Sequence, residues 1–416
     1  MRLYIDPGTG SMLFTILIGL IGVARYAFKT WFLKAKFVLG GGRKSQSDGD
    51  RLPLVIFADD KRYWLIFEPI CRELAAKNFP VKYLTFSKDD AALSCEYADF
   101  KAEYIGNDNK AFAKLNFLNA VMVLSTTPGL DVYQWKRSRE VDCYIHIPHA
   151  PSDITLYRMF GIDYYDAILL SGDYQIKQVR ALEKLRNLPA KELTMVGLPY
   201  MDEMQKRAIQ FSETEEHQRT VLLAPSWGPS AILTKYGEKM IKALLETGYH
   251  IVIRPHPQSF QSEKLLMDKL MQEFPNSENL EWNRDTDNFS VLGRSDILIS
   301  DFSGVIFDYA LIFDRSVIYT NEGFDDSVYD AWWLDEMPWV FRILPSLGME
   351  LNENKLDDLK NLIDTCISAS QFAEGRKRAR EETWQHQGVG AKKVADYLIK
   401  KYQQSQTNAV VQEVKK

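Results

Sequence analysis

This chain of 416 residues lacks the sequence features of several classes of protein. Its four cysteines are scattered and form no CxxC pair, so no disulfide framework is expected and a reducing compartment fits. The formal net charge of −5 argues against a general nucleic-acid binder. The sequence also lacks the GxxxxGK[ST], GxSxG and HExxH motifs. We expect no nucleic-acid partner, no metal and no cofactor.

Charge is missing from a stretch near the N-terminus. Residues 7–24 are uncharged and mostly apolar, and a helix over residues 11–33 would reach roughly 35 Å, enough to cross a bilayer core. Basic residues follow this stretch: Arg25, Lys29, Lys34, Lys36, Arg43 and Lys44. Their placement predicts that residues 1–40 anchor the protein in the cytoplasmic membrane, with the catalytic domains on the cytoplasmic face. A cleaved signal peptide fits poorly, whereas a re-entrant or interfacial helix remains an alternative.

Two rounds of alternating strands and helices follow a polar linker at residues 41–51. The strands predicted in the first round are residues 52–58, 81–86, 120–125, 141–147 and 166–170. Those predicted in the second round are residues 221–224, 250–254, 279–282, 296–300 and 316–319. Apolar strands alternating with helices indicate parallel sheets covered on both faces. The predicted fold is α/β, with two doubly wound, Rossmann-like halves whose ligand lies at the carboxyl ends of the strands.

The two rounds set the predicted domain boundaries. Residues 52–210 form an N-terminal acceptor domain, and residues 220–375 form a C-terminal domain for a donor nucleotide. A helix is expected to run through residues 372–402, with its part from residue 376 to 402 forming a separate C-terminal helix. The polar tail at residues 403–416 is expected to fray.

One turn after a predicted strand carries a candidate general base. Histidine is scarce, with six residues, and His149 follows the apolar strand at residues 141–147. Imidazole titrates near neutrality and can take a proton from an attacking hydroxyl; the alternative is a structural histidine bonded to a loop. A metal site built from His146, His149 and Asp153 is disfavoured because Pro148 and Pro151 preclude a helix that would align them.

Two strand ends in the second round carry groups that suit a phosphate. Arg254 can bind phosphate oxygens with two parallel hydrogen bonds, and prolines on both sides stiffen His256. The alternative is a surface arginine and a turn histidine. The strand ending at Ser300 leads through a small polar turn, residues 301–304, into a helix whose N-terminus favours an anion. A DxD triplet at residues 285–287 is better explained as a helix N-cap.

These segments together resemble the CDP-glycerol glycerophosphotransferase family, whose members build teichoic-acid-like polymers. The matching segments are VGLP at residues 196–199 with Asp202, APSW at 224–227, RPHP at 254–257 and ISDFSGVIFDYA at 299–310. The resemblance spans roughly residues 120–325. Three positions depart from the family pattern: Trp-His-Gly reads Pro148-His149-Ala150, Tyr200 replaces an arginine, and Gly304 replaces the second serine of a pair.

The resemblance implies a GT-B fold and a transferase that moves glycerol phosphate from CDP-glycerol, or a related CDP-polyol, and releases CMP. It implies that His149 and His256 are catalytic. The donor would be bound by Pro225, Ser226, Arg254, His256, Ser300, Asp301, Ser303 and Gly304. With a membrane anchor, the expected acceptor is a lipid-linked glycan or polyol phosphate. The alternatives are an inverting UDP-sugar transferase or a UDP-sugar 2-epimerase on the same fold, and a non-catalytic membrane-tethered scaffold that binds nucleotide.

Overall fold

A computed structural model describes residues 51–211, 218–285 and 287–414. The predicted membrane anchor and all but the last residue of the linker lie outside these ranges. Among the residues that the structure describes, no helix combines the length and the apolar character needed to cross a bilayer. Residues 52–416 form one compact unit.

The first half contains a seven-stranded sheet in the order β3-β2-β1-β4-β5-β6-β7, with all neighbours parallel. Its central strands are continuous apolar runs that are almost completely buried, as a sheet covered on both faces requires. The strands are β1 (Leu52–Ala58), β2 (Val81–Thr85), β3 (Phe100–Tyr104), β4 (Asn119–Ser125), β5 (Glu140–His146), β6 (Ala167–Leu170) and β7 (Glu192–Met195). The helices are η2 (Lys61–Tyr63), α2 (Trp64–Ala75), η3 (Ala91–Ser94), α3 (Asn109–Asn116), η4 (Ile154–Leu156), α4 (Tyr174–Arg186) and α5 (Pro199–Gln210).

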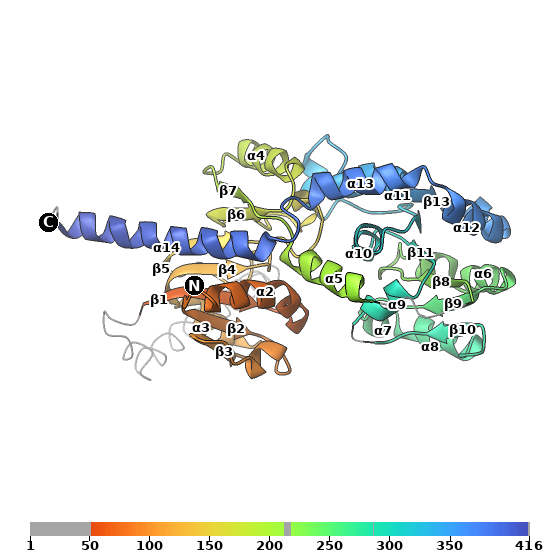
Figure 1. Cartoon of the computed structure of the whole chain (residues 1–416), viewed down its shortest axis with the longest axis horizontal. Coiled ribbons are helices and arrows are strands. Elements are labelled where there is room, and N and C mark those ends of the chain that lie inside the picture. Colours follow the sequence, from red (N-terminus) through yellow and green to blue (C-terminus); the bar gives the residue numbers. More distant parts are fainter. Residues whose placement is uncertain (1–50, 212–217, 286, 415–416) are drawn as a thin grey trace, which may run out of the picture. The chain divides into compact units, whose positions relative to one another are not determined.

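The second half contains a six-stranded parallel sheet in the order β10-β9-β8-β11-β12-β13 (Figure 1). The strands are β8 (Thr220–Leu223), β9 (His250–Ile253), β10 (Leu280–Trp282), β11 (Ile297–Ser300), β12 (Val317–Tyr319) and β13 (Gly348–Glu350). The helices before the chain returns to the first half are α6 (Ile232–Glu246), α7 (Ser259–Ser262), α8 (Lys264–Glu273), α9 (Phe289–Gly293), α10 (Val305–Ile312), η5 (Asp330–Trp333), α11 (Trp339–Leu347), η6 (Glu353–Asp358), α12 (Leu359–Ser368) and α13 (Phe372–Thr383). Two parallel, doubly wound sheets confirm the predicted α/β class.

Each sheet reverses its strand order at one point, and that point is where ligands bind in open α/β sheets. In the first sheet the reversal lies between β1 and β4, and in the second it lies between β8 and β11. The turns after β8 and β11 hold Pro225, Ser226, Asp301, Ser303 and Gly304, which the family resemblance assigns to the donor. His149 follows β5, one strand away from the reversal in the first sheet.

The C-terminal helix predicted over residues 372–402 is broken. α13 ends at Thr383, and α14 (Gly390–Val414) begins after a connection in which His386 and Gly388 have φ of 59° and 78°. α13 packs on α10 and α11, whereas α14 packs on α2 and α5 (Figure 1). The chain therefore returns to the first half, and the helix continues into residues that the sequence predicted to fray.

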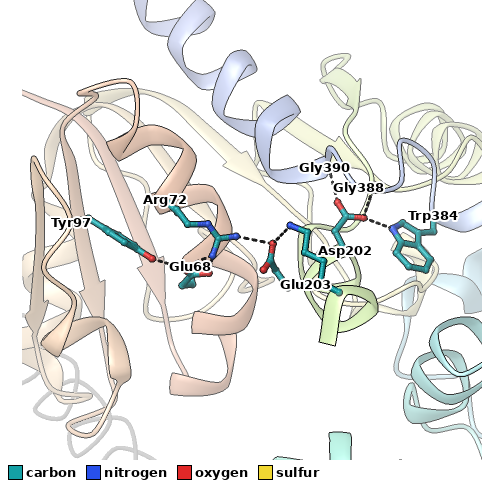
Figure 2. Close-up of polar contacts among 9 residues, drawn as sticks. Glu68, Arg72, Tyr97, Asp202, Glu203, Trp384, Gly388 and Gly390 are labelled. Carbon is teal, nitrogen blue, oxygen red and sulfur yellow. Dashed lines mark hydrogen bonds and ion pairs between the residues drawn. The ribbon is translucent and has the colours of Figure 1, made fainter. Parts of the chain in front are cut away.

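Asp202, from the motif near residue 196, holds this connection in place. Its carboxylate is buried and accepts hydrogen bonds from Trp384 Nε1 at 2.8 Å, from Gly388 N at 2.7 Å and from Gly390 N at 2.9 Å (Figure 2). The last two donors lie at the start of α14, where backbone N–H groups lack partners within the helix. The motif aspartate is thus a structural link between α5 and the two C-terminal helices.

Replacing Asp202 by alanine is expected to lower the free energy of unfolding by about 2–5 kcal/mol, because three donors lose their acceptor in a buried site. The neighbouring Glu203 is the matched control. It binds Arg72 and Lys206 at the surface, so its replacement by alanine is expected to cost about 1 kcal/mol or less. Urea unfolding of the two variants measures the difference, and equal losses would contradict the structural role of Asp202.

Two further carboxylates join the halves near the cleft. Asp153 accepts hydrogen bonds from the backbone N–H groups of Trp339 and Val340, at 2.7 and 2.9 Å, and so caps the start of α11. Asp330, which is fully buried in the segment between β12 and α11, forms an ion pair with Arg186 of α4. These contacts fix the walls of the cavity described next.

Candidate functional site

A cavity of about 280 Å³ lies between residues of the two halves. His149, Ser152 and Tyr157 line it from the first half. The second half contributes Ser303 and Gly304 at the start of α10, together with aromatic side chains from two other segments. The full lining is His149, Ala150, Pro151, Ser152, Leu156, Tyr157, Asp301, Phe302, Ser303, Gly304, Ile306, Phe307, Phe324, Val340, Phe341 and Leu344.

His149 is held on one side and open to the cavity. Its Nδ1 lies 3.2 Å from the hydroxyl of the buried Thr126, at the end of β4. The rings of Tyr63 and Tyr157 pack at centroid distances of 5.2 and 6.3 Å. The pKa of His149 is lowered to about 4, mainly by burial and then by the charge of Arg62, while a backbone hydrogen bond at Thr126 opposes both effects. His149 is therefore neutral at pH 7, as a proton acceptor must be.

The metal site considered from the sequence does not form. His146 is fully buried, its Nε2 lies 3.0 Å from the Tyr157 hydroxyl, and burial lowers its pKa to about 3. The Asp153 carboxylate is occupied by the backbone of α11 and by Gln178. Within the described ranges, no group of His, Cys, Asp and Glu side chains is arranged to hold a metal.

His256 lies after β9 in a turn that fixes which ring nitrogen carries the proton. The backbone N–H of Gln258 donates to His256 Nδ1 at 3.1 Å. Because that nitrogen accepts, Nε2 carries the proton in the neutral ring and serves as a donor. Burial lowers the pKa of His256, and the charge of Arg62 adds to this effect. The exposed Trp227 ring lies 6.4 Å away, centroid to centroid.

Arg254 is half-buried at the end of the same strand. Its guanidinium donates to Asn283 Oδ1 at 2.6 Å, and Asn283 in turn donates to Asp285. Burial lowers the pKa of Arg254, while Asp285 and Asp287 oppose this shift. The DxD triplet thus contributes acidic groups beside Arg254. Asp287 accepts the N–H of Phe289, the first residue of α9, but the N-cap position is Asn288, so the triplet is not the N-cap that the sequence predicted.

Asp301 and Ser300 are engaged within the protein. Asp301 is fully buried, and its two oxygens accept the backbone N–H groups of Ser226 at 2.8 Å and of Ile232 at 3.0 Å. The hydroxyl of Ser300 donates to Ala224 O at 2.6 Å. Burial raises the pKa of Asp301, and the two backbone hydrogen bonds oppose this. Both residues hold the turn after β8 against the turn after β11, and so position the loop that carries Ser226.

The turn at residues 301–304 leads into α10, whose first turn faces the cavity. Gly304 has an ordinary helical φ of −59°, and a Cβ added there would meet open space. The serine of the family pattern would therefore fit at this position. Tyr200, which replaces the family arginine, donates its hydroxyl to Asp308 of α10 at 2.8 Å. Burial raises the pKa of Asp308 to about 6.

The cavity brings together four of the predicted site residues: His149, Asp301, Ser303 and Gly304. Pro225, Ser226, Arg254, His256 and Ser300 lie at the ends of β8, β9 and β11 without lining it. The sequence interpretation missed Arg62, Tyr63 and Thr126, which surround His149. The sequence pattern could have identified them, because residues 59–63 and 126–127 form polar turns directly after the buried strands β1 and β4.

Part of the chain matches a known protein family. Residues 162–332 match the family described as CDP-Glycerol:Poly(glycerophosphate) glycerophosphotransferase. No curated protein matches the chain significantly.

Solved structures share the fold. Two structures of the wall teichoic acid polymerase TagF, one soaked with CDPG, are 16% identical, with TM-scores of 0.57 and 0.55. The alignments cover 91% and 92% of this chain and 98% of each polymerase chain. The UDP-GlcNAc 2-epimerase of Neisseria meningitidis is 13% identical with a TM-score of 0.52, over 83% of this chain and 99% of the epimerase. The fold is GT-B-like, and the resemblance to the glycerophosphotransferase family is confirmed over residues 162–332.

Proposed function

We propose that the protein transfers a polyol phosphate, most simply glycerol phosphate, from a CDP-activated donor to a lipid-linked glycan or polyol-phosphate acceptor and releases CMP. The observation that carries the proposal is the cavity in which His149 of the first half faces the N-terminus of α10 in the second half. A neutral imidazole opposite a helix N-terminus provides a base for a hydroxyl and a site for a phosphate.

In this mechanism His149 activates the acceptor. Its Nδ1 lies beside the Thr126 hydroxyl, so we assign the proton to Nδ1 and the acceptor role to Nε2. The acceptor oxygen attacks the donor phosphorus in line with the leaving group, and its proton passes to His149 Nε2. A new bond forms between that oxygen and the phosphorus, while the bond from the phosphorus to the CMP oxygen breaks.

The second half stabilises the leaving group. The backbone N–H of Gln258 fixes His256 with its proton on Nε2, so the ring can donate to a phosphate oxygen without being charged. Arg254 and the start of α10 add positive electrostatic potential at the same edge of the sheet. CMP leaves with the electron pair of the broken bond.

A donor screen tests the proposal. Purified full-length protein is incubated with CDP-glycerol, CDP-ribitol or UDP-sugars, together with a defined lipid acceptor, and the released nucleotide is identified. Release of CMP from a CDP-polyol supports the proposal. Release of UDP from a UDP-sugar would support a sugar transferase, conversion of a UDP-sugar into its 2-epimer would support an epimerase, and binding without turnover would support a scaffold.

The proposed membrane association rests on the sequence of residues 1–40. Removal of residues 1–50 is expected to leave a folded protein, because residues 52–416 form a compact unit with its own cores. Such a truncated protein should bind CDP with unchanged affinity but act poorly on acceptor embedded in vesicles. Vesicle flotation measures the difference. Full-length protein that stays entirely in the soluble fraction, or truncated protein that fails to fold, would contradict the proposal.

A further inference from the structure

We propose that Arg62 is the cation with which the first half of the protein contacts the phosphoryl group in transit from donor to acceptor. This inference rests on the proposed function and deepens it, because it names a phosphate-binding residue outside the matching motifs. Arg62 belongs to η2, which follows β1 at the reversal point of the first sheet. The ligand it would take is the β-phosphate of a nucleoside diphosphate.

Contacts along the chain place Arg62 beside His149. The Asp60 carboxylate accepts the Arg62 backbone N–H at 2.9 Å and so fixes the start of η2. The guanidinium carbon of Arg62 lies 5.3 Å from the centroid of the Tyr63 ring. That ring lies 5.2 Å from the ring of His149. The Tyr63 ring therefore contacts both the Arg62 guanidinium and the ring of the proposed base, His149.

The charge of Arg62 acts on both sides of the cleft. Burial is the largest effect that lowers the pKa of His149, and the charge of Arg62 is the next largest. The same order holds for the pKa of His256. Because the interaction of charges weakens with distance, a cation that acts on both rings is within electrostatic reach of the space between them. The reacting phosphorus would occupy that space, since His149 serves the nucleophile and His256 serves the leaving group.

Positive charge is otherwise scarce at the cavity. None of the described residues that line it is a lysine or an arginine. Arg254 donates to Asn283, and Lys61 forms an ion pair with Asp89. Arg62 forms an ion pair with Asp60, with 3.6 Å between Nε and Oδ1, and it also hydrogen-bonds the Tyr63 side chain, yet 62% of the Arg62 side chain is exposed. Its planar fork is thus accessible to phosphate oxygens.

The test compares Arg62→Ala with Lys61→Ala, which removes the adjacent cation of the same turn. Calorimetry of the full chain uses CDP, CMP and inorganic pyrophosphate as probes. Arg62→Ala is expected to weaken binding of CDP and pyrophosphate about tenfold or more, the usual worth of a charge-assisted contact, and to change CMP binding little. Lys61→Ala should leave all three affinities within about twofold. Arg62→Lys should restore part of the lost affinity for CDP and pyrophosphate, because lysine keeps the positive charge but lacks the planar guanidinium that can form two parallel hydrogen bonds.

A second readout uses the effect on His149. Loss of the cation should move the acid limb of the kcat/KM profile to higher pH, since a nearby positive charge lowers the pKa of His149. Equal ratios of CDP to CMP affinity in the wild type, Lys61→Ala and Arg62→Ala would overturn the inference even if CMP is released. A raised acceptor KM with unchanged pyrophosphate binding would place Arg62 on an acceptor phosphate and also overturn it. Release of UDP by the wild type would refute the proposed function alone, because pyrophosphate binding still decides the role of Arg62.

Discussion

Replacing His149 by alanine is expected to lower kcat for CMP release by about 10²–10⁴-fold, the range for loss of a general base. The side chain lies in the first half, whereas the proposed donor-binding residues lie in the second half. The affinity for CDP should therefore change little. Added imidazole should restore part of the activity, because the truncation leaves space in a cavity of about 280 Å³. Steady-state kinetics and CDP calorimetry of the variant provide the measurement. Near-normal turnover would remove His149 from the mechanism.

The pH dependence of the wild type follows from the same residue. Burial and the charge of Arg62 together lower the pKa of His149 to about 4. The other ionisable groups packed around the ring are Tyr63, Tyr157 and His146, and burial keeps the two phenols protonated and the His146 imidazole neutral. Protonation removes the base, so kcat/KM should be constant above about pH 5 and fall as the pH drops through about 4.

Replacing His256 by alanine is expected to lower kcat by about 10²–10³-fold, as for loss of one preorganised donor to a developing oxyanion. The physical reason is the fixed Nε2 donor, which the Gln258 backbone sets by donating to Nδ1. Arg254→Ala should instead weaken CDP binding, because a cation at the strand end is lost from ground state and transition state alike.

His250 provides the matched control for His256. It lies on the same strand, β9, but at its start, where its Nδ1 lies 3.2 Å from Glu278 O. Replacing His250 by alanine should leave kcat and CDP affinity close to the wild type, because the opposite end of the sheet carries the site. Equal losses in the His250 and His256 variants would indicate a general effect on the fold, and unchanged activity in both would refute the role of His256.

The sequence predicts the central strands well, and it fails at three of the four edge strands. β1, β4 and β11 are apolar runs with both faces buried, so their pattern is unambiguous. β3 is an edge strand with alternating polar residues, and β7 and β13 are short edge strands, so none was predicted. The break after α13 was signalled by Gly388 and Gly390, whose backbone N–H groups bind Asp202.

The sequence also indicates only part of the candidate site, because local patterns carry no information about contacts between distant segments. Local patterns reveal which residues follow a strand, and they located the residue His149 and the turn that begins α10. They do not reveal which buried groups are bound by distant backbone, and so they could not show that both oxygens of Asp301 are taken by Ser226 and Ile232. The surroundings of His149 come from β1 and β4, more than 20 residues away in sequence.

The most direct test of the central claim follows the fate of the β-phosphorus of the donor. CDP-glycerol labelled at that phosphorus is incubated with lipid acceptor and full-length enzyme, with His149→Ala as the inactive reference. Transfer of a polyol phosphate predicts that the label moves to the acceptor and that unlabelled CMP is released in equal amount. Labelled CDP in solution with unlabelled acceptor would show that both phosphates leave with the nucleotide, as in sugar transfer, and would contradict the account.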